Sequence, residues 1–264
     1  MARPFSLKRL LGFYIAQLPD DFQGLPGGAE YRPYYKLRDL RTRMSLRAED
    51  TGAWSGRLHV LAGHAEYKTF RALEGNPRIV YIREQYPFTS PEVLQALLDG
   101  VVPARNQVWT IDFLLTLPPL QRFGPLRYHA LSSKPDGLKE TPSEQRRRAR
   151  EVAKLQSFGI TCSYIREPSD IEHFNNEKLH GWCKHRGIDE AWGKAQELAA
   201  LFYRTTSRKT LRGQLSMFAK RLQIPAELQW FFFAAAYYFG FIQIDHRFKL
   251  GEDLPLVLKE PRHE

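Results

Sequence analysis

An aspartate and a lysine stand in two apolar runs near the middle of the chain. Asp112 interrupts the run at 108–115, and Lys134 lies near the end of the run at 128–135, with a loop rich in proline and glycine between them. This pattern predicts two antiparallel strands joined by the loop. A strand-borne carboxylate that faces an ammonium group on the next strand indicates a metal-dependent phosphodiesterase, because the carboxylate can hold a divalent ion while the ammonium group orients water or offsets phosphate charge. The alternative is a structural hairpin with a half-exposed aspartate and a lysine at its end.

The elements around this hairpin follow from the spacing of apolar residues. They are, in chain order, a strand at 56–61, a helix at 63–74, a strand at 78–87, a helix at 89–100, a helix at 140–157 and a strand at 159–165. Glu66 falls in the first turn of its helix, where an acid is favourable beside the helix dipole. The helix at 140–157 is strongly charged, which suits a solvated face or contact with DNA. The order of elements predicts an α/β domain built on a mixed sheet flanked by helices.

The C-terminal part is predicted to be mostly helical. Its helices cover 170–185, 190–204, 210–222 and 226–239. Two short strands, at 240–244 and 254–258, are predicted around a turn at 249–253. Helices followed by a small hairpin resemble a winged helix, a module that binds DNA or docks protein.

The composition favours an anionic partner. Among 264 residues, 39 Lys and Arg face 29 Asp and Glu, which gives a net charge of +10. Nucleic acid is the first partner that such a balance indicates, and a membrane surface is the second. The stretch at 31–47 mixes arginines with tyrosines, which suits contact with phosphates and sugars or an arm lying on a partner protein. No apolar run is long enough to span a bilayer, and two cysteines without a CxxC pair fit a reduced cytoplasmic setting.

Several stretches, taken together, resemble the TnsA family, the transposon endonuclease that works beside a DDE-type transposase. The first is the strand at 56–61, which leads to Glu66 at the head of a helix. The second contains residues 82–85, which read IREQ as in the family. Its spacing is also similar, since Arg83 lies 83 − 66 = 17 positions after Glu66.

The other stretches lie in and after the central hairpin. Residues 110–114 read TIDFL and are similar to the family's TDFLV, and residues 133–135 read SKP, similar to its VKP. A basic helix with Glu151 and the strand at 159–165 follow in the family's order. The similarity covers roughly 55–170 well and holds only in outline further on.

The resemblance implies a domain organisation and a function. A basic arm at 1–50 would precede a restriction-endonuclease-like domain at 51–167 and a winged-helix-like docking domain at 168–264. The implied activity is Mg²⁺-dependent cleavage of the 5′ strand at transposon ends, with Mn²⁺ as a substitute ion, by one subunit of a heteromeric cut-and-paste transposase. Its partners would be double-stranded DNA at transposon ends, a DDE-type transposase and an AAA+ ATPase regulator bound through the C-terminal domain, without a membrane. The implied location is the bacterial cytoplasm, at the nucleoid.

The resemblance also implies the roles of site residues. The family's catalytic residues match Glu66, Asp112 and Lys134. Asp112 would be the central Mg²⁺ ligand, Glu66 would complete the acidic site directly or through water, and Lys134 would position or activate the attacking water. The main-chain carbonyl of Ser133 is the implied ligand from the second strand. Glu151 falls where the family has a further acid near the site.

One position departs from the family. Ser132 stands two residues before Lys134, where the family has Glu or Gln. A hydroxyl is a poorer ligand and brings no charge, so metal binding would depend on Glu66 or Glu151, or activity would require a partner. Two other functions remain open: a restriction-type or junction-resolving nuclease of the same fold, and a non-catalytic scaffold that binds DNA and partner proteins.

A zinc site in the C-terminal part is disfavoured. Its ligands would be His173, His180, Cys183 and His185. Helical geometry points Cys183 and His185 to different faces, and no second pair of ligands is present in the sequence.

Overall fold

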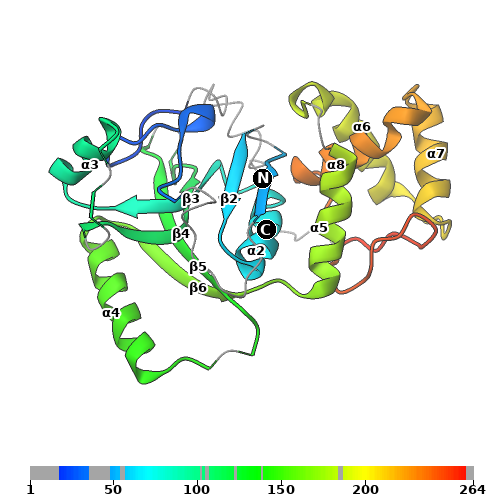
Figure 1. The fold of residues 1–264 in the computed structure, drawn as a ribbon. Helices are drawn as coiled ribbons and strands as arrows, with labels where there is room; N and C mark the ends of the chain where they lie inside the picture. Colours follow the sequence, from blue (N-terminus) through cyan, green and yellow to red (C-terminus); the bar gives the residue numbers. More distant parts are fainter. Residues whose placement is uncertain are drawn as a thin grey trace.

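The chain forms a part built on β-sheet and, beside it, a helical part (Figure 1). The computed structural model describes residues 18–35, 48–53, 57–101, 103–104, 107–121, 124–137, 139–183 and 187–259. Most of the basic stretch at 31–47 lies outside these residues.

Four strands form the central sheet. They are β3 (Tyr81–Phe88), β4 (Trp109–Leu117), β5 (Arg127–Lys134) and β6 (Thr161–Arg166), adjacent in that order. The strand β4 runs antiparallel to both of its neighbours, β3 and β5, whereas β5 and β6 run parallel and are connected through α4 (Pro142–Ser157). The predicted hairpin and mixed sheet are therefore confirmed, and Phe113 pairs with Leu131 at its centre.

Helices cover both faces of this sheet. On one face, Phe70 of α2 (His64–Glu74) packs against Phe113 of β4. On the other face, Leu155 of α4 packs with Leu114. Thr141 begins α4 with a capping box, in which its hydroxyl accepts the Glu144 N–H while the Glu144 carboxylate accepts the Thr141 N–H. Further along the chain from β3, α3 (Pro91–Leu98) begins after Ser90, whose hydroxyl accepts the Val93 N–H.

A second, two-stranded sheet lies next to α2. It pairs β1 (Ala48–Thr51) with β2 (Leu58–Leu61) in antiparallel fashion. The strand β2 was predicted, but β1 was not, and β1 begins inside the stretch interpreted as a basic arm. Its sequence, Ala-Glu-Asp-Thr, has no alternation of apolar and polar residues, so pairing with β2 alone defines it as a strand.

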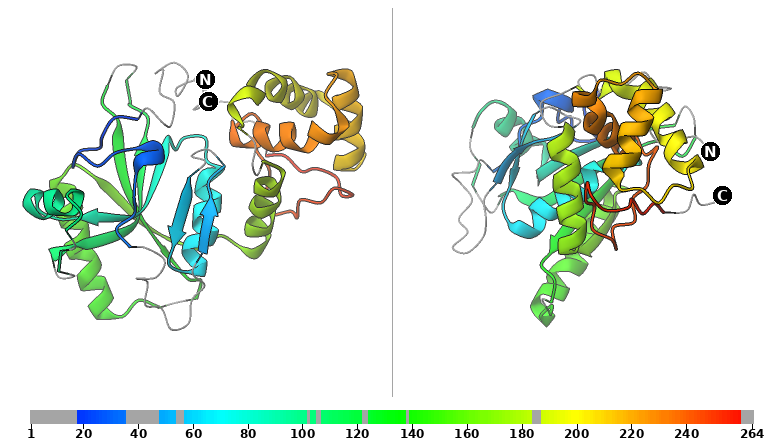
Figure 2. Two further views of the ribbon diagram at one scale, coloured as in Figure 1. Left: turned by 45° about the horizontal axis from the view of Figure 1, so that its top comes forward. Right: turned by 90° about the vertical axis from the view of Figure 1, so that its right-hand side faces the viewer.

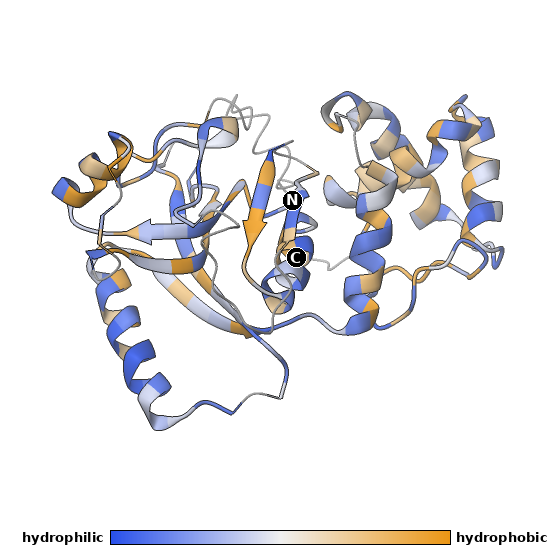
Figure 3. Cartoon of the chain, viewed as in Figure 1, coloured by the Kyte–Doolittle hydropathy of each residue, from blue (hydrophilic) through white to orange (hydrophobic). Residues whose placement is uncertain are grey.

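The helical part contains four α-helices packed around an aromatic core. They are α5 (Asp170–Cys183), α6 (Trp192–Arg204), α7 (Leu211–Arg221) and α8 (Gln229–Tyr238). The ring of Phe202 lies 5.0 Å from that of Phe218 and 5.4 Å from that of Phe233, measured between centroids. Apolar residues gather where these helices face one another (Figure 3). Single turns of 3₁₀ helix occupy Gly28–Glu30, Asp189–Ala191 and Ala226–Leu228.

The prediction of two strands, at 240–244 and 254–258, is wrong. A single antiparallel bridge, between Ile244 and Leu258, is all that pairs them. The carbonyl of Leu254 instead accepts the N–H of Leu211 at 2.8 Å, so this segment satisfies the exposed N-terminus of α7. In the other segment Phe241 and Ile242 are buried in succession before the exposed Gln243, so burial does not alternate as it does along an outer strand.

Ion pairs join the two parts through α2 and α5, which lie side by side (Figure 2). Arg71 of α2 has no exposed surface and pairs with Asp50 of β1, with Glu74 at 2.8 Å and with Glu177 of α5 at 3.0 Å. His180 of α5 lies 3.0 Å from the same guanidinium. Within the described part of the chain, none of the helices combines the length and apolar character needed to cross a bilayer.

Candidate active site

Three elements bring the sequence-predicted carboxylates together. Asp112 lies in β4, and its carboxylate accepts the Ser133 N–H of β5 at 2.9 Å. Glu66 lies in the first turn of α2 and is close enough for its charge and that of Asp112 to act on each other. Lys134, at the end of β5, acts electrostatically on both acids. The predicted trio therefore converges on one place at the end of the β4–β5 hairpin.

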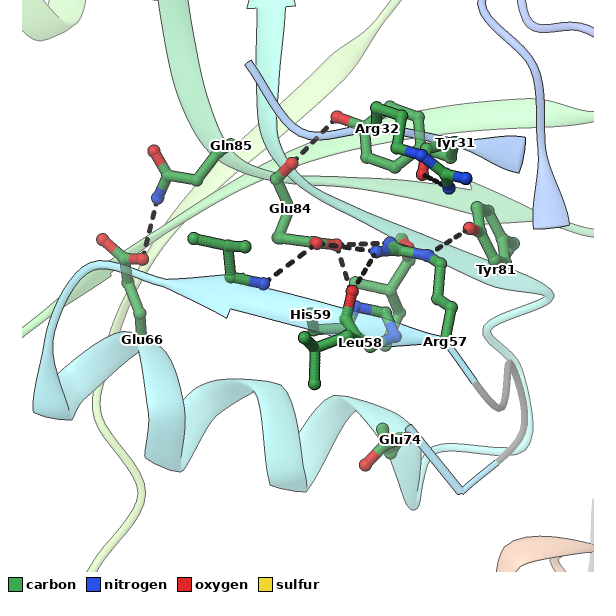
Figure 4. Close-up of polar contacts among 12 residues, drawn as sticks. Tyr31, Arg32, Arg57, Leu58, His59, Glu66, Glu74, Tyr81, Glu84 and Gln85 are labelled. Carbon is green, nitrogen blue, oxygen red and sulfur yellow. Dashed lines mark hydrogen bonds and ion pairs between the residues drawn. The ribbon is translucent and has the colours of Figure 1, made fainter. Parts of the chain in front are cut away.

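Glu66 is held by two donors on the same oxygen. Its Oε2 accepts the Ala62 N–H at 2.8 Å and the Gln85 side-chain amide at 2.8 Å (Figure 4). Burial, followed by the nearby charge of Asp112, raises the pKa of Glu66 to about 8, despite these hydrogen bonds and the charge of Lys134. The carboxyl group of Glu66 is therefore harder to ionise than an ordinary glutamate, and a cation bound beside it would favour its ionised form.

The pKa of Asp112 is also raised. Burial raises its pKa, and this effect outweighs hydrogen bonds from the Ser133 N–H and the Ser132 hydroxyl and the charge of Lys134. The charge of Glu151 adds to the rise. Ser132, the position that departs from the family, therefore donates to Asp112, which is a supporting contact rather than an added charge.

Glu151 reaches the rim of the site from α4. Its carboxylate accepts the Tyr164 hydroxyl at 2.8 Å and pairs with Arg147 at 3.3 Å. Glu151, Arg147 and Tyr164 line a groove that also contains Lys134. The structure therefore places Glu151 beside the trio, with its own neutralising partners.

The hydroxyl of Ser133 points to α2 rather than to the carboxylates. It donates to the Ala65 carbonyl at 3.1 Å and lies 2.7 Å from the Thr69 hydroxyl. Only the main chain of Ser133 is thus directed at the site, through the N–H that Asp112 accepts. The carbonyl role implied for Ser133 stays a prediction.

The donor set suits a hard divalent cation. Carboxylate oxygens are the ligands that Mg²⁺ prefers, and a cation between Glu66 and Asp112 would offset the charge of Asp112, which adds to the effect of burial in raising the pKa of Glu66. Among the described residues, no three His, Cys, Asp or Glu side chains gather closely enough to hold a metal by themselves. The two carboxylates would therefore need water or main-chain oxygens to complete the coordination.

Among the described residues of the helical part, the zinc ligands considered above are not brought together. Cys183 is buried in the aromatic core, and burial raises the pKa of its thiol. His180 lies against Arg71, and His173 packs edge-on against the ring of Tyr67. The fourth predicted ligand, His185, lies outside the described residues.

A buried charge network behind the site was not predicted. Glu84 of β3 has no exposed surface and accepts hydrogen bonds from Arg57 at 2.7 Å, His59 at 2.8 Å and the Val60 N–H at 3.2 Å (Figure 4). Burial lowers the pKa of His59, so a neutral ring donates its Nδ1–H at neutral pH. Burial alone would raise the pKa of Glu84, but its contacts with His59 and Arg57 prevail and lower it to about 2. The available sign of this network was a run of three polar residues, Arg83, Glu84 and Gln85, inside a predicted strand.

No protein-family model matches the sequence, and the search of curated proteins finds no match either. The fold and the site therefore define a mixed α/β protein in which a four-stranded and a two-stranded sheet, flanked by helices, present a carboxylate pair beside a lysine.

Raised carboxyl pKa values make the metal-free protein sensitive to pH. The folded-state pKa of Glu66 is about 8 against an ordinary value of 4.5, so the folded chain holds this proton more tightly than the unfolded chain. Stability is then fully present below about pH 4.5 and is lost as the pH rises to about 8. We expect a loss on the order of 2 kcal/mol across this window, less than the full shift implies because the carboxyl group is partly solvated.

Thermal unfolding in EDTA between pH 5 and pH 8.5 would measure this loss. The variant Glu66→Gln should unfold with a weaker pH dependence, whereas Glu140→Gln, at an exposed acid, should follow the native chain. Added Mg²⁺ should restore stability at the upper end of the range. Equal pH dependence in the native chain and Glu66→Gln would contradict the raised pKa.

Proposed function

We propose that the chain is a divalent-metal-dependent DNA endonuclease of restriction-endonuclease-like fold. The observation that carries this proposal is the convergence of Glu66 and Asp112 beside Lys134, with both carboxylates fixed by N–H donors. Two acids and a lysine that meet at one place are the groups that phosphodiester hydrolysis with a hard cation requires.

Each residue has a distinct task in this proposal. Asp112 and Glu66 hold the cation, and Glu151 supplies a further acid at the rim. When bound, Mg²⁺ offsets the negative charge that develops on the phosphate and lowers the pKa of a coordinated water. Lys134 orients the attacking water and stabilises the charge on the phosphate, while the Ser132 hydroxyl keeps the Asp112 carboxylate in place.

Surface charge supports DNA as the substrate. The net charge is +10, and α4 carries Arg146, Arg147, Arg148 and Arg150 along the rim of the site. The Arg147 side chain is 62 % exposed and lines the same groove as Lys134. A duplex lying along this groove would bring its phosphates to the carboxylate pair, and binding would weaken steeply with salt.

The transposon context rests on the resemblance of residues 55–170 to the TnsA family. In this context the chain cuts the 5′ strand at transposon ends beside a DDE-type transposase. The helical part, α5 to α8, would be the winged-helix-like module that docks the AAA+ regulator. Such an enzyme would work in the bacterial cytoplasm, at the nucleoid.

Strand cleavage at a transposon end tests the proposal. Each strand of the end DNA is labelled separately, and the native chain is incubated in Mg²⁺ with and without the cognate transposase. We expect one cut, at the 5′ strand, that requires the transposase. Cutting of arbitrary DNA by the chain alone would favour a restriction-type or junction-resolving nuclease.

A scaffold without catalysis is the second candidate, favoured by one observation. Ser132 supplies a hydroxyl where the family has an acid or amide, so one charged or stronger ligand is missing. A native chain that assembles with the transposase on end DNA, yet cuts neither strand in Mg²⁺ or Mn²⁺, would establish the scaffold in place of the enzyme.

A further inference from the structure

Gln85 has an unusual backbone conformation in the middle of β3, which is an edge strand of the four-stranded sheet. Its φ is +46°, in the left-handed region that residues with side chains rarely adopt, although it lies within β3. The pairing of β3 with β4 is regular on both sides, with Glu84 opposite Phe113 and Tyr86 opposite Ile111. Between these pairs, Gln85 stands opposite Asp112, and the ladder omits this one pair.

This kink changes which face of the sheet the side chains occupy. Alternation along a strand would put residues 82, 86 and 88 on the same face. Ile82 instead packs in the cluster beneath α2, whereas Tyr86 and Phe88 pack on the opposite face, with α4. The change of face occurs at Gln85, so the left-handed residue redirects its side chain out of the regular pattern.

The surrounding residues hold the kink in place. The N–H of Tyr34 donates to the Gln85 carbonyl at 3.2 Å, and the hydroxyl of Tyr31 donates to the Glu84 carbonyl at 2.8 Å. The Glu84 side chain is fixed in turn by Arg57 (Figure 4). Strained backbone that is secured from several sides is found mainly at functional sites.

The redirected side chain of Gln85 contacts Glu66. Gln85 is only 5 % exposed, and its amide donates to Glu66 Oε2 at 2.8 Å. The Ala62 N–H donates to the same oxygen, so both hydrogen bonds that hold this carboxylate among the described residues engage Oε2. A glutamine amide can fix a carboxylate in this way without adding another charge.

We propose that Gln85 is a positioning residue, which uses a strained backbone to aim its amide at Glu66 and so presets the Glu66–Asp112 pair for a divalent cation. This inference rests on the proposed function, because it assigns the pair to metal binding. A purely structural role, in which the amide only fastens α2 to the sheet, predicts that loss of the amide lowers stability and leaves metal affinity unchanged.

The chain offers a matched pair of variants. Gln85→Gly removes the amide and relieves the left-handed strain, because glycine adopts positive φ without penalty. Gln223 is the other described residue with a side chain and positive φ, at +55°, and it lies exposed after α7, in the helical part. Gln223→Gly therefore relieves the same kind of strain without touching the site. Gln85→Leu removes the amide and keeps most of the volume.

The first readout is Mn²⁺ binding measured by calorimetry on the full chain, with no DNA present. We expect both Gln85 variants to bind Mn²⁺ about tenfold more weakly, since partners of metal ligands typically change affinity by that much or more, and Gln223→Gly to bind as the native chain does. Thermal unfolding without metal should show Gln85→Gly to be at least as stable as Gln85→Leu, which retains the strain.

Two outcomes separate failure of this inference from failure of the function. Native Mn²⁺ affinity in Gln85→Gly and Gln85→Leu would overturn the positioning role while leaving the nuclease proposal intact. A native chain that binds Mn²⁺, loses affinity in the Gln85 variants and cuts no DNA would support the positioning role and overturn the nuclease. A native chain that binds no Mn²⁺ would overturn both.

Discussion

Replacing Asp112 with asparagine is expected to reduce DNA cleavage about 1000-fold while leaving the fold intact. Asparagine keeps the shape of the side chain and can still accept the Ser133 N–H, but it removes one of the two charges that, in the proposed function, hold the cation. Because the charge of Asp112 raises the pKa of Glu66, its removal should also make the metal-free protein slightly more stable above pH 7. Loss of activity with a gain in stability is the pattern expected of a charge kept for function.

Strand cleavage and thermal unfolding, measured on the same samples, would test this pair of effects. Lys134→Ala should also abolish cutting, by removing the ammonium group. Asp136→Asn is the control. Asp136 lies two residues after Lys134 and pairs with Arg166 in an exposed contact. If Asp112→Asn cuts as fast as the native chain, then the catalytic assignment of the carboxylate pair is wrong.

Replacing Glu84 with glutamine is expected to destabilise the protein by about 3 kcal/mol. The substitution removes the charge that neutralises Arg57, which is 8 % exposed and cannot turn to water. It also turns one acceptor oxygen into a donor that faces the Arg57 guanidinium and the His59 Nδ1–H. A buried ion pair that loses one partner leaves an uncompensated charge, which accounts for the size of the effect.

The urea midpoint at pH 7 would measure this loss. Glu140→Gln breaks the pair with Arg148, whose side chain is 39 % exposed, and should change stability by less than about 1 kcal/mol. The native chain should in addition lose stability as the pH falls from about 4.5 to 2, where Glu84 takes up a proton in the folded state, and Glu84→Gln should lack that component. Equal midpoints for the two variants would show that the network contributes little.

Elements with a strong apolar period were predictable from the sequence. The hairpin of β4 and β5 and the helix α2 follow from local spacing, and Asp112, Glu66 and Lys134 then come together because adjacent elements pack together. The strand β1 and the segment after α8 were not predictable in this way. The first depends on a partner strand, and the second uses its carbonyl groups to complete α7.

The roles of Glu84 and Gln85 in β3 were not predicted, for the same reason. The interpretation of residues 78–87 as one strand was correct in kind, but a regular strand alternates its faces and does not indicate a left-handed glutamine. The conformation of Gln85 is imposed by contacts from Tyr31 and Tyr34, about fifty residues earlier in the chain. Glu84 likewise depends on Arg57, and sequence spacing alone does not reveal such distant partners.

The helix α2 belongs to both parts of the molecule at once. Its first turn supplies the Glu66 carboxylate, and the buried Arg71 guanidinium, five residues further on, is held by Glu177 and His180 of α5. A chain shortened at residue 167 would open this charge to water on one side and leave it without half of its partners. The part built on β-sheet therefore cannot be separated from the helical part without exposing Arg71, so the two parts have to be expressed and assayed together.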